Sequence, residues 1–134
     1  MSEHAIVRVR DVMNDRYILI DGLETVGAAF TEVKRTEARC IIVKKRDELD
    51  EHGIVLLSDI AIKVIAADRS PERVNIYEIM SKPVISVNPD MDIRYTARLF
   101  NQFGIAVAPV MEQGKVVGIV TYTDIVLQGL FAGE

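Results

Sequence analysis

The sequence predicts an α/β fold made of two β-α-β-β-α repeats that face each other with pseudo-two-fold symmetry. Residues 53–60 and 118–125 have similar sequences. In each, a Gly begins an apolar run, and an Asp lies where the next apolar helix would begin. Apolar positions elsewhere also recur at a constant offset, which aligns Val26 with Ile93. One repeat of about 60 residues is too small to bury its apolar strands alone, so two are expected to pack together.

The first repeat contains three predicted strands and two predicted helices. Residues 17–20 form a β-type run, and apolar residues at three- and four-residue spacing predict a helix from Thr25 to about Glu37. Strands are predicted at residues 40–43 and 53–57, on either side of a charged hairpin, and a second helix from Asp59 to about Ala67. The apolar face of the first helix is expected to contain Val26, Ala29, Phe30 and Val33.

The second repeat follows the same pattern. Residues 84–87 match the first strand, and residues 93–100 match the first helix. The offset between the repeats is shorter at Gly53 and Gly118, which places a two-residue length difference in the hairpin, where insertions cost little. We therefore divide the chain into an N-terminal arm (1–10), a first repeat (11–67), a bridge (68–77) and a second repeat (78–134).

Composition excludes several classes of site. The net charge of −4 provides no broad cationic field, so we expect no nucleic-acid partner. Cys40 is the single cysteine, which rules out an intramolecular disulfide, and the two histidines stand without a ligand cluster, so no metal site is expected.

No apolar run reaches the roughly 18 residues that cross a bilayer, and residues 1–4 have no signal-peptide pattern. We expect a cytoplasmic protein without membrane insertion. The mean hydropathy of +0.18 is high for so charged a chain and suggests apolar surface that a partner subunit covers.

Asp59 and Asp124 have two readings. Asp is a preferred N-cap residue, so each could cap the helix that begins there. The duplication of the preceding Gly-Ile-Val favours a ligand role instead, because a cap does not need those residues. Asp124 follows Thr121, whereas Leu56 holds the equivalent position before Asp59.

These motifs resemble the cystathionine-β-synthase (CBS) domain family in its tandem form, the Bateman module. The resemblance rests on Asp-Val-Met at residues 11–13, Glu-Ile-Met at 78–80, Pro109-Val110, and the two Gly-Ile-Val blocks that end in Asp-Ile. It covers roughly residues 10–131 and implies two crossed clefts between the repeats that bind adenosine-containing ligands: AMP, ADP, ATP or S-adenosylmethionine.

The resemblance also implies the site residues. In the main site, ribose contacts come from Thr121, Thr123 and Asp124, and the adenine side from Ile18, Ala38 and Arg39. A second and weaker site would use Ser58 and Asp59 with Val84, Ile85, Ile105, Val107 and Pro109. It is expected to be weaker because Leu56 supplies no hydroxyl. Arg39, Lys82 and Arg94 are candidates for a phosphate contact.

The resemblance further implies a regulatory module that forms a homodimer through the helices after Asp59 and Asp124. We expect it to require no cofactor and to act in trans on an effector protein that the sequence does not identify. The alternative is a structural dimerisation module without a functional ligand site. Enzymatic activity is not expected, because neither hydroxyl motif has a His or Lys nearby in the sequence to act as a base, and no Gly-rich phosphate loop or metal-ligand spacing occurs.

Overall fold

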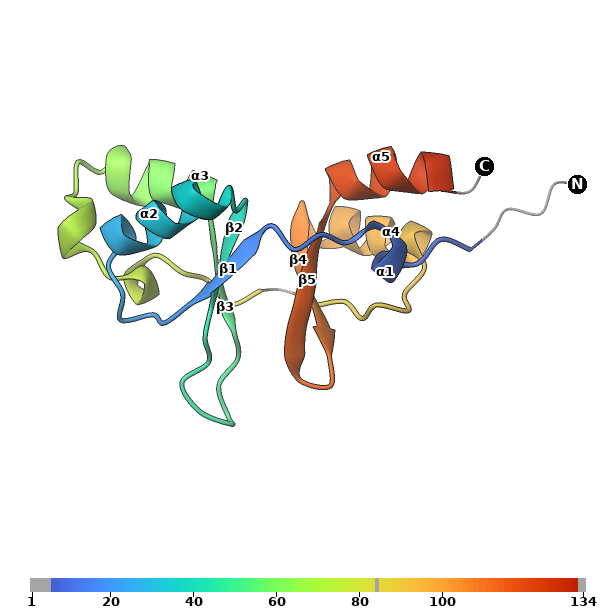
Figure 1. Ribbon diagram of the computed structural model, residues 1–134, viewed down its shortest axis with the longest axis horizontal. Coiled ribbons are helices and arrows are strands. Elements are labelled where there is room, and N and C mark those ends of the chain that lie inside the picture. The colour runs from blue at the N-terminus through green and yellow to red at the C-terminus, as the bar shows by residue number, and fades with distance from the viewer. Residues whose placement is uncertain (1–5, 84, 133–134) are drawn as a thin grey trace, which may run out of the picture. The chain divides into compact units, whose positions relative to one another are not determined.

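The computed structural model describes residues 6–83 and 85–132, and the chain forms two compact units (Figure 1). Unit 2 is the continuous stretch Arg16–Pro83, and unit 1 combines the chain before and after it. The units differ from the sequence repeats in one respect. The first residues of each repeat belong to the unit that holds the rest of the other repeat.

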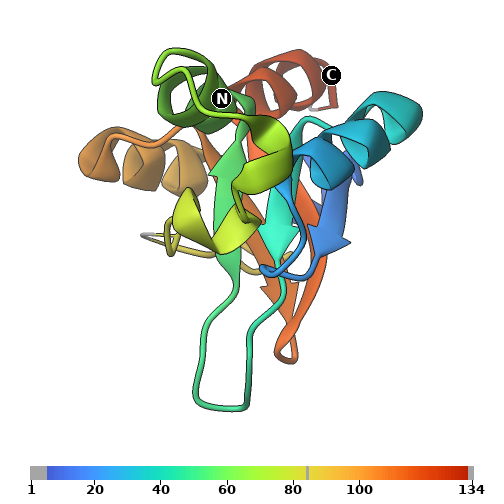
Figure 2. The same ribbon diagram turned by 90° about the vertical axis from the view of Figure 1, so that its left-hand side faces the viewer.

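Unit 2 contains a three-stranded sheet in the order β1-β2-β3. β1 (Tyr17–Ile20) pairs in parallel with β2 (Cys40–Val43), and β2 pairs antiparallel with β3 (Gly53–Leu56). A parallel pair needs a crossover connection, which α2 (Val26–Thr36) provides. These elements confirm the predicted β-α-β-β order, and the β2–β3 connection extends beyond the sheet as a long loop (Figure 2).

Helix α2 begins and ends at recognisable capping residues. The Thr25 hydroxyl accepts a hydrogen bond from the Ala28 amide, and Glu37 ends the helix in the left-handed conformation, with φ of 57°. The helix buries Val26, Ala29 and Val33. Phe30 is 51% exposed, so the prediction that it shares the buried face is wrong. It lies at the edge of a stripe narrower than the sequence spacing suggested.

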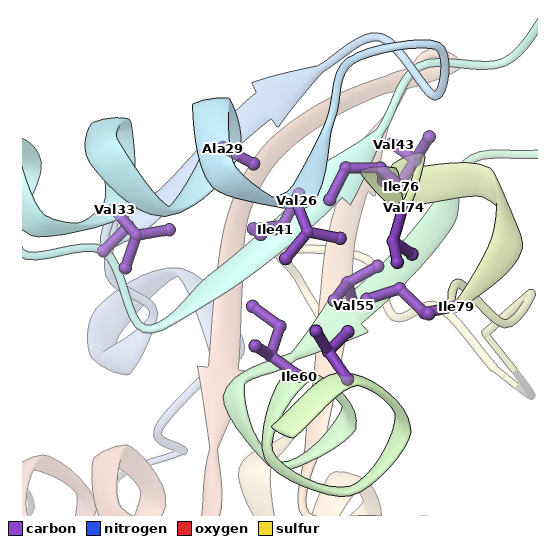
Figure 3. Close-up of a cluster of buried hydrophobic side chains, with 12 residues drawn as sticks. Val26, Ala29, Val33, Ile41, Val43, Val55, Ile60, Val74, Ile76 and Ile79 are labelled. Carbon is purple, nitrogen blue, oxygen red and sulfur yellow. The ribbon is translucent and has the colours of Figure 1, made fainter. Parts of the chain in front are cut away.

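The core of unit 2 lies between this sheet and its helices (Figure 3). Each fully buried aliphatic side chain contributes about 1.5–3 kcal/mol relative to an exposed one. The buried cluster consists of Val26, Ala29, Val33, Ala38, Ile41, Val43, Val55, Ile60, Val64, Val74, Ile76 and Ile79.

The helix after β3 differs from its prediction. It begins at Leu57, two residues before Asp59, as α3 (Leu57–Ile60), and continues as a π-helical stretch, η1 (Ala61–Ile65). Two short 3₁₀ turns follow, η2 (Pro71–Arg73) and η3 (Ile76–Glu78).

Unit 1 contains the short helix α1 (Val9–Val12), α4 (Ile93–Phe103), the antiparallel pair β4 (Val107–Glu112) and β5 (Lys115–Thr121), and α5 (Tyr122–Ala132). Its core includes Val9, Val12, Val87, Ile93, Phe100, Ala108, Val110 and Val120. The Phe100 ring packs edge-on against Tyr122, with centroids 5.3 Å apart.

The strand predicted at residues 84–87 is wrong for the described residues 85–87. Val84 lies outside the described residues, and the segment makes one parallel bridge, Val87 to Val110. Val87 donates to the Pro109 carbonyl and accepts from the Met111 amide. The next bond of a parallel ladder would need the amide hydrogen of residue 109, and proline has none.

A short antiparallel pairing joins the first residues of each repeat to its unit. In unit 1, Asn14 and Ile119 exchange two main-chain hydrogen bonds, both of 2.9 Å. In unit 2, Ser81 and Ile54 exchange equivalent bonds of 2.8 and 3.0 Å. Each pairing adds one more extended segment beside the strand that leads to a candidate site residue.

This close approach explains why both motifs contain a glycine. A Cβ at Gly118 would lie 3.1 Å from the Asn14 carbonyl oxygen and 3.2 Å from Met13 Sδ. A Cβ at Gly53 would lie 2.7 Å from Met80 Sδ. The two Gly residues therefore leave room for the segment that pairs with them.

Within the described residues, no helix has both the length and the apolar character needed to cross a bilayer.

Burial of Cys40 generates a prediction about pH. Its side chain is buried in β2, and desolvation raises the pKa of the thiol from 9.0 to about 12. The thiol pKa is higher in the folded state than in the unfolded state. The contribution of the neutral Cys40 thiol to stability is therefore complete below pH 9 and is lost as the pH rises towards about 12. The unfolding free energy of the wild type should fall by about 1.4 kcal/mol per pH unit more than that of Cys40→Ala over this range. If the unfolding free energies of the wild type and Cys40→Ala, measured with urea, fall in parallel over this pH range, the prediction is contradicted.

Candidate functional site

The junction of β5 and α5 in unit 1 holds two of the predicted site residues. Thr121 ends β5, and Asp124 is the third residue of α5. The Asp124 Oδ2 accepts from the Thr121 amide at 3.0 Å and from its hydroxyl at 2.8 Å. The Asp124 amide lies 3.1 Å from Thr121 Oγ1, which completes a capping box. Thr121 is therefore the N-cap, and the interpretation of Asp124 as the N-cap is wrong in position. Asp124 still takes part in the cap, because its carboxylate accepts from the Thr121 amide.

Asn14 is a residue of this junction that the sequence reasoning missed. Its side-chain amide donates to Asp124 Oδ2 at 2.8 Å, across 110 residues of sequence. The main-chain pairing of Asn14 with Ile119 brings it beside β5. The one sequence signal was its position directly after the Asp-Val-Met motif, but nothing in that motif indicates which strand it will join.

Three hydrogen bonds thus converge on one oxygen of a half-buried carboxylate. Bonds from donors to a charged acceptor are roughly twice as strong as neutral ones, so they hold the Asp124 side chain in one orientation. They all end on Oδ2. A ligand hydroxyl that approaches Asp124 would therefore be accepted chiefly by Oδ1.

The equivalent junction in unit 2 is built differently. Asp59 Oδ2 accepts from the Leu56 amide at 2.8 Å, which is half of a capping box, because Leu56 has no hydroxyl to reciprocate. Asp59 is thus not an N-cap either. Lys63 Nζ lies 3.6 Å from Asp59 Oδ1 and donates to the Ile79 carbonyl at 3.1 Å. Lys63 was also missed, although its spacing of four residues on a helix is a recognisable ion-pair signal.

The other residues predicted for the main site are divided between the units. Thr123 is exposed on α5 in unit 1. Ile18 is half-buried against the core of unit 2, and Ala38 is part of that core. Arg39 is exposed, and its amide donates to the Arg16 carbonyl at 2.7 Å. The structure therefore brings Thr121 and Asp124 together within one unit, and the roles of Ile18, Ala38 and Arg39 remain predictions.

The residues predicted for the second site are divided in the opposite way. Ser58, which is exposed, and Asp59 belong to unit 2. Four described residues belong to unit 1: Ile85, Ile105, Val107 and Pro109. Ile85 and Ile105 pack against the core of unit 1, Pro109 is buried in β4, and Val84 lies outside the described residues.

Two of the three candidate phosphate contacts have acidic partners. Lys82 Nζ lies 3.0 Å from Asp50 Oδ1 and donates to the Glu51 carbonyl, and Arg94 pairs with Asp92 at 3.0 Å. Hydrogen bonds from the Arg46 amide and from Lys82 hold the pKa of Asp50 well below its usual range. Among the described residues, the Arg39 side chain is in no ion pair, and its phosphate contact remains a prediction.

The described part of the chain contains no group of three His, Cys, Asp or Glu side chains that could hold a metal ion.

Comparison with known proteins identifies similar sequences. The model of the CBS domain family matches residues 76–128. An uncharacterized protein of Methanopyrus kandleri is 38% identical over 86 residues, which are 63% of this chain and 43% of that protein. The chain thus spans less than half the length of this curated relative.

Two solved structures are similar over nearly the whole chain. A hexameric CBS-CP12 protein from bloom-forming cyanobacteria is 36% identical, with a TM-score of 0.87, over 95% of this chain and 73% of that one. The CBS domain pair of the protein MJ0100, in complex with 5′-methylthioadenosine and S-adenosyl-L-methionine, is 27% identical, with a TM-score of 0.76, over 96% of this chain and 98% of that one.

The capping box predicts the effect of removing one hydroxyl. Thr121→Val keeps the β-branched shape and loses the hydroxyl that accepts from the Asp124 amide. The unfolding free energy should fall by about 0.5–2 kcal/mol. Thr123→Val, an exposed position on the same helix, is the matched control and should change it by less than about 0.5 kcal/mol. Equal urea midpoints for the two variants would show that the box does not stabilise α5.

Proposed function

Because the chain belongs to the CBS domain family, as a tandem pair, we propose that it is a regulatory module that binds an adenosine-containing ligand and acts on an effector protein in trans. The candidate ligands are S-adenosylmethionine, AMP, ADP and ATP. The observation that carries the proposal is the similarity, over 96% of the chain, to a CBS pair in complex with 5′-methylthioadenosine and S-adenosyl-L-methionine. Both of those ligands contain an adenosine group.

The proposal assigns the ribose to the junction at Thr121 and Asp124. A carboxylate accepts hydrogen bonds from hydroxyl groups, and Asn14 and Thr121 already hold Asp124 through Oδ2. The ribose hydroxyls would therefore bind mainly at Oδ1. The adenine contacts predicted for Ile18, Ala38 and Arg39 are part of the same proposal.

The equivalent position in unit 2 is proposed to bind more weakly. Leu56 offers no hydroxyl, and Lys63 lies 3.6 Å from Asp59 Oδ1, the oxygen that a ribose would need. A ligand there would compete with the ammonium group for the carboxylate. This ion pair is a second physical reason for a difference between the sites, beside the missing hydroxyl.

Regulation requires that the ligand prefer one arrangement of the module over another, because a ligand shifts an equilibrium only by its differential affinity for two states. The proposed role is therefore to bind and signal, without chemistry on the ligand. Thr121 and Asp124 fit such a role, since both bond to the start of α5 and a ligand that contacts them would act on that helix.

We also propose that the module forms a homodimer through α3–η1 and α5. Both segments expose large apolar side chains at positions that correspond when Asp59 is aligned with Asp124. Ile62 is 67% exposed and Leu127 is 55% exposed; Ile65 and Leu130 are 70% and 67% exposed. Apolar groups repeated in this way on two helices fit an interface between copies of the chain.

Ligand binding is tested by thermal shift and calorimetry with S-adenosylmethionine, 5′-methylthioadenosine, AMP, ADP and ATP. A ligand that binds only the folded state raises the melting temperature. Asp124→Asn keeps an acceptor for the Thr121 amide but loses the charge, so affinity should fall roughly 10- to 150-fold, the equivalent of about 1.5–3 kcal/mol for a hydrogen bond to a charged group. Asp11→Ala is the control, because Asp11 accepts from the Arg8 amide in the same way outside the proposed site.

If none of these ligands stabilises the folded protein, the proposed function fails and the structural dimerisation module is the better description. If a ligand binds Asp124→Asn as tightly as the wild type, binding is real but the assignment of Asp124 is wrong.

The homodimer is tested by light scattering after size-exclusion chromatography. Ile62→Asp and Leu127→Asp, separately and together, should shift the protein towards the monomer, because a charge would be buried at the interface. Leu49→Asp is the matched control, since Leu49 is 96% exposed and lies outside these helices. A dimer that survives both substitutions would place the interface elsewhere.

A further inference from the structure

Each unit contains a main-chain hydrogen bond that is equivalent to one in the other unit, but the side chains beside it differ. In unit 1 the Arg10 amide donates to the Pro89 carbonyl at 2.9 Å. In unit 2 the Tyr77 amide donates to the Gly22 carbonyl at 3.0 Å. These contacts are equivalent, because the offset that aligns the first helices of the two repeats also aligns Arg10 with Tyr77 and Gly22 with Pro89. The same backbone arrangement can therefore be compared with two sets of side chains.

In unit 1 this position is occupied by an ion pair. The Arg10 guanidinium binds Asp90 Oδ1, and Arg8 Nη1 donates to the Asp90 carbonyl at 2.7 Å. These polar groups bind one another, and water can satisfy their remaining hydrogen bonds. This position in unit 1 therefore needs no protein partner.

In unit 2 the equivalents of Arg10 and Asp90 are apolar and exposed. Tyr77 is 51% exposed and Leu23 is 75% exposed. The loop that carries Leu23 is held in place, because the Leu23 amide donates to Asp21 Oδ1 at 2.8 Å and its carbonyl accepts from Asn75 Nδ2 at 2.7 Å. The two side chains are therefore presented on a fixed backbone.

Two exposed carboxylates, Asp21 and Glu24, flank Leu23. Neither is in an ion pair with another described residue, unlike Asp90 in unit 1. This surface, made of Asp21, Leu23, Glu24 and Tyr77, thus combines an exposed apolar centre with negative charge. The apolar residues proposed for the homodimer occur in both units, whereas this pair occurs in unit 2 alone.

Charge decides among possible occupants. The same surface on a second copy of the chain would bring like charges together, and an anionic membrane or a nucleic acid would be repelled. A protein segment with an apolar side chain next to Lys or Arg would match both the centre and the charged margin.

We propose that the surface of Asp21, Leu23, Glu24 and Tyr77 is a docking site for a basic, partly apolar segment of the effector protein. This inference rests on the proposed action in trans. It assigns the effector contact to one unit, so the two halves of the chain have different roles in spite of their repeated sequence.

The test is an NMR titration of the ¹⁵N-labelled full chain with a short peptide that alternates leucine with lysine. The amides of residues 21–24 and 75–78 should shift. The double variant Leu23→Asp, Tyr77→Arg places the residue types of Asp90 and Arg10 at the equivalent positions, and should bind the peptide at least roughly tenfold more weakly. Leu49→Asp, which also removes an exposed leucine, should bind like the wild type.

Several results would overturn the docking site: equal binding by the double variant, shifts elsewhere in the chain, or equal binding of a peptide with glutamate in place of lysine. If the double variant is misfolded by its own spectrum, Asp21→Asn with Glu24→Gln replaces it and should weaken binding and reduce its salt dependence. Adenosine-ligand affinity is measured on the same samples. Its absence in the wild type would refute the proposed function, whereas ligand binding without peptide binding would refute the docking site alone.

Discussion

The antiparallel main-chain pairing of Asn14 with Ile119, and of Ser81 with Ile54, ties each unit together. Each pair uses two hydrogen bonds to join the first residues of one sequence repeat to the strand of the other. The pairing requires Gly118 and Gly53 beside it, because a Cβ would meet the paired segment. The N-terminal segment that forms this pairing also contributes Val9 and Val12 to the core of unit 1. Each unit therefore contains residues from both sequence repeats.

The same pairing connects the fold to the proposed binding site. Asn14 reaches Asp124 because its backbone is bonded to β5, and Thr121 reaches it because the strand ends directly before the helix. The carboxylate thus stabilises the start of α5 and is held in one orientation by the same contacts. In unit 2, Leu56 and Ser81 stand at the positions of Thr121 and Asn14, and Lys63 adds a positive charge. The two junctions share an equivalent main-chain pairing, and a few different side chains give them different chemistry.

Comparison of the two units also separates two kinds of exposed apolar surface. Residues such as Ile62 and Leu127 are exposed at equivalent positions in both units, as expected for a surface that the repeated fold uses in a common way. Leu23 and Tyr77 are exposed in unit 2, where unit 1 has the Arg10–Asp90 ion pair. An internal repeat thus provides its own reference, because a side chain in one unit can be compared with its equivalent in the other on a similar backbone.

The amino-acid sequence was sufficient to predict the fold class and the order of elements in unit 2, and its motifs singled out Thr121 and Asp124 as residues to examine. The sequence shows the elements through local periodicity and the two-repeat architecture through its duplication. It was not sufficient to show that Thr121 is the cap, that Pro109 limits the strand near Val87, or that Phe30 is exposed. Asn14 was the hardest to foresee, because its contact with Asp124 spans 110 residues and depends on which strand the N-terminal segment joins. Sequence spacing encodes contacts along one helix or strand, whereas pairing between distant segments is established only when the whole chain packs.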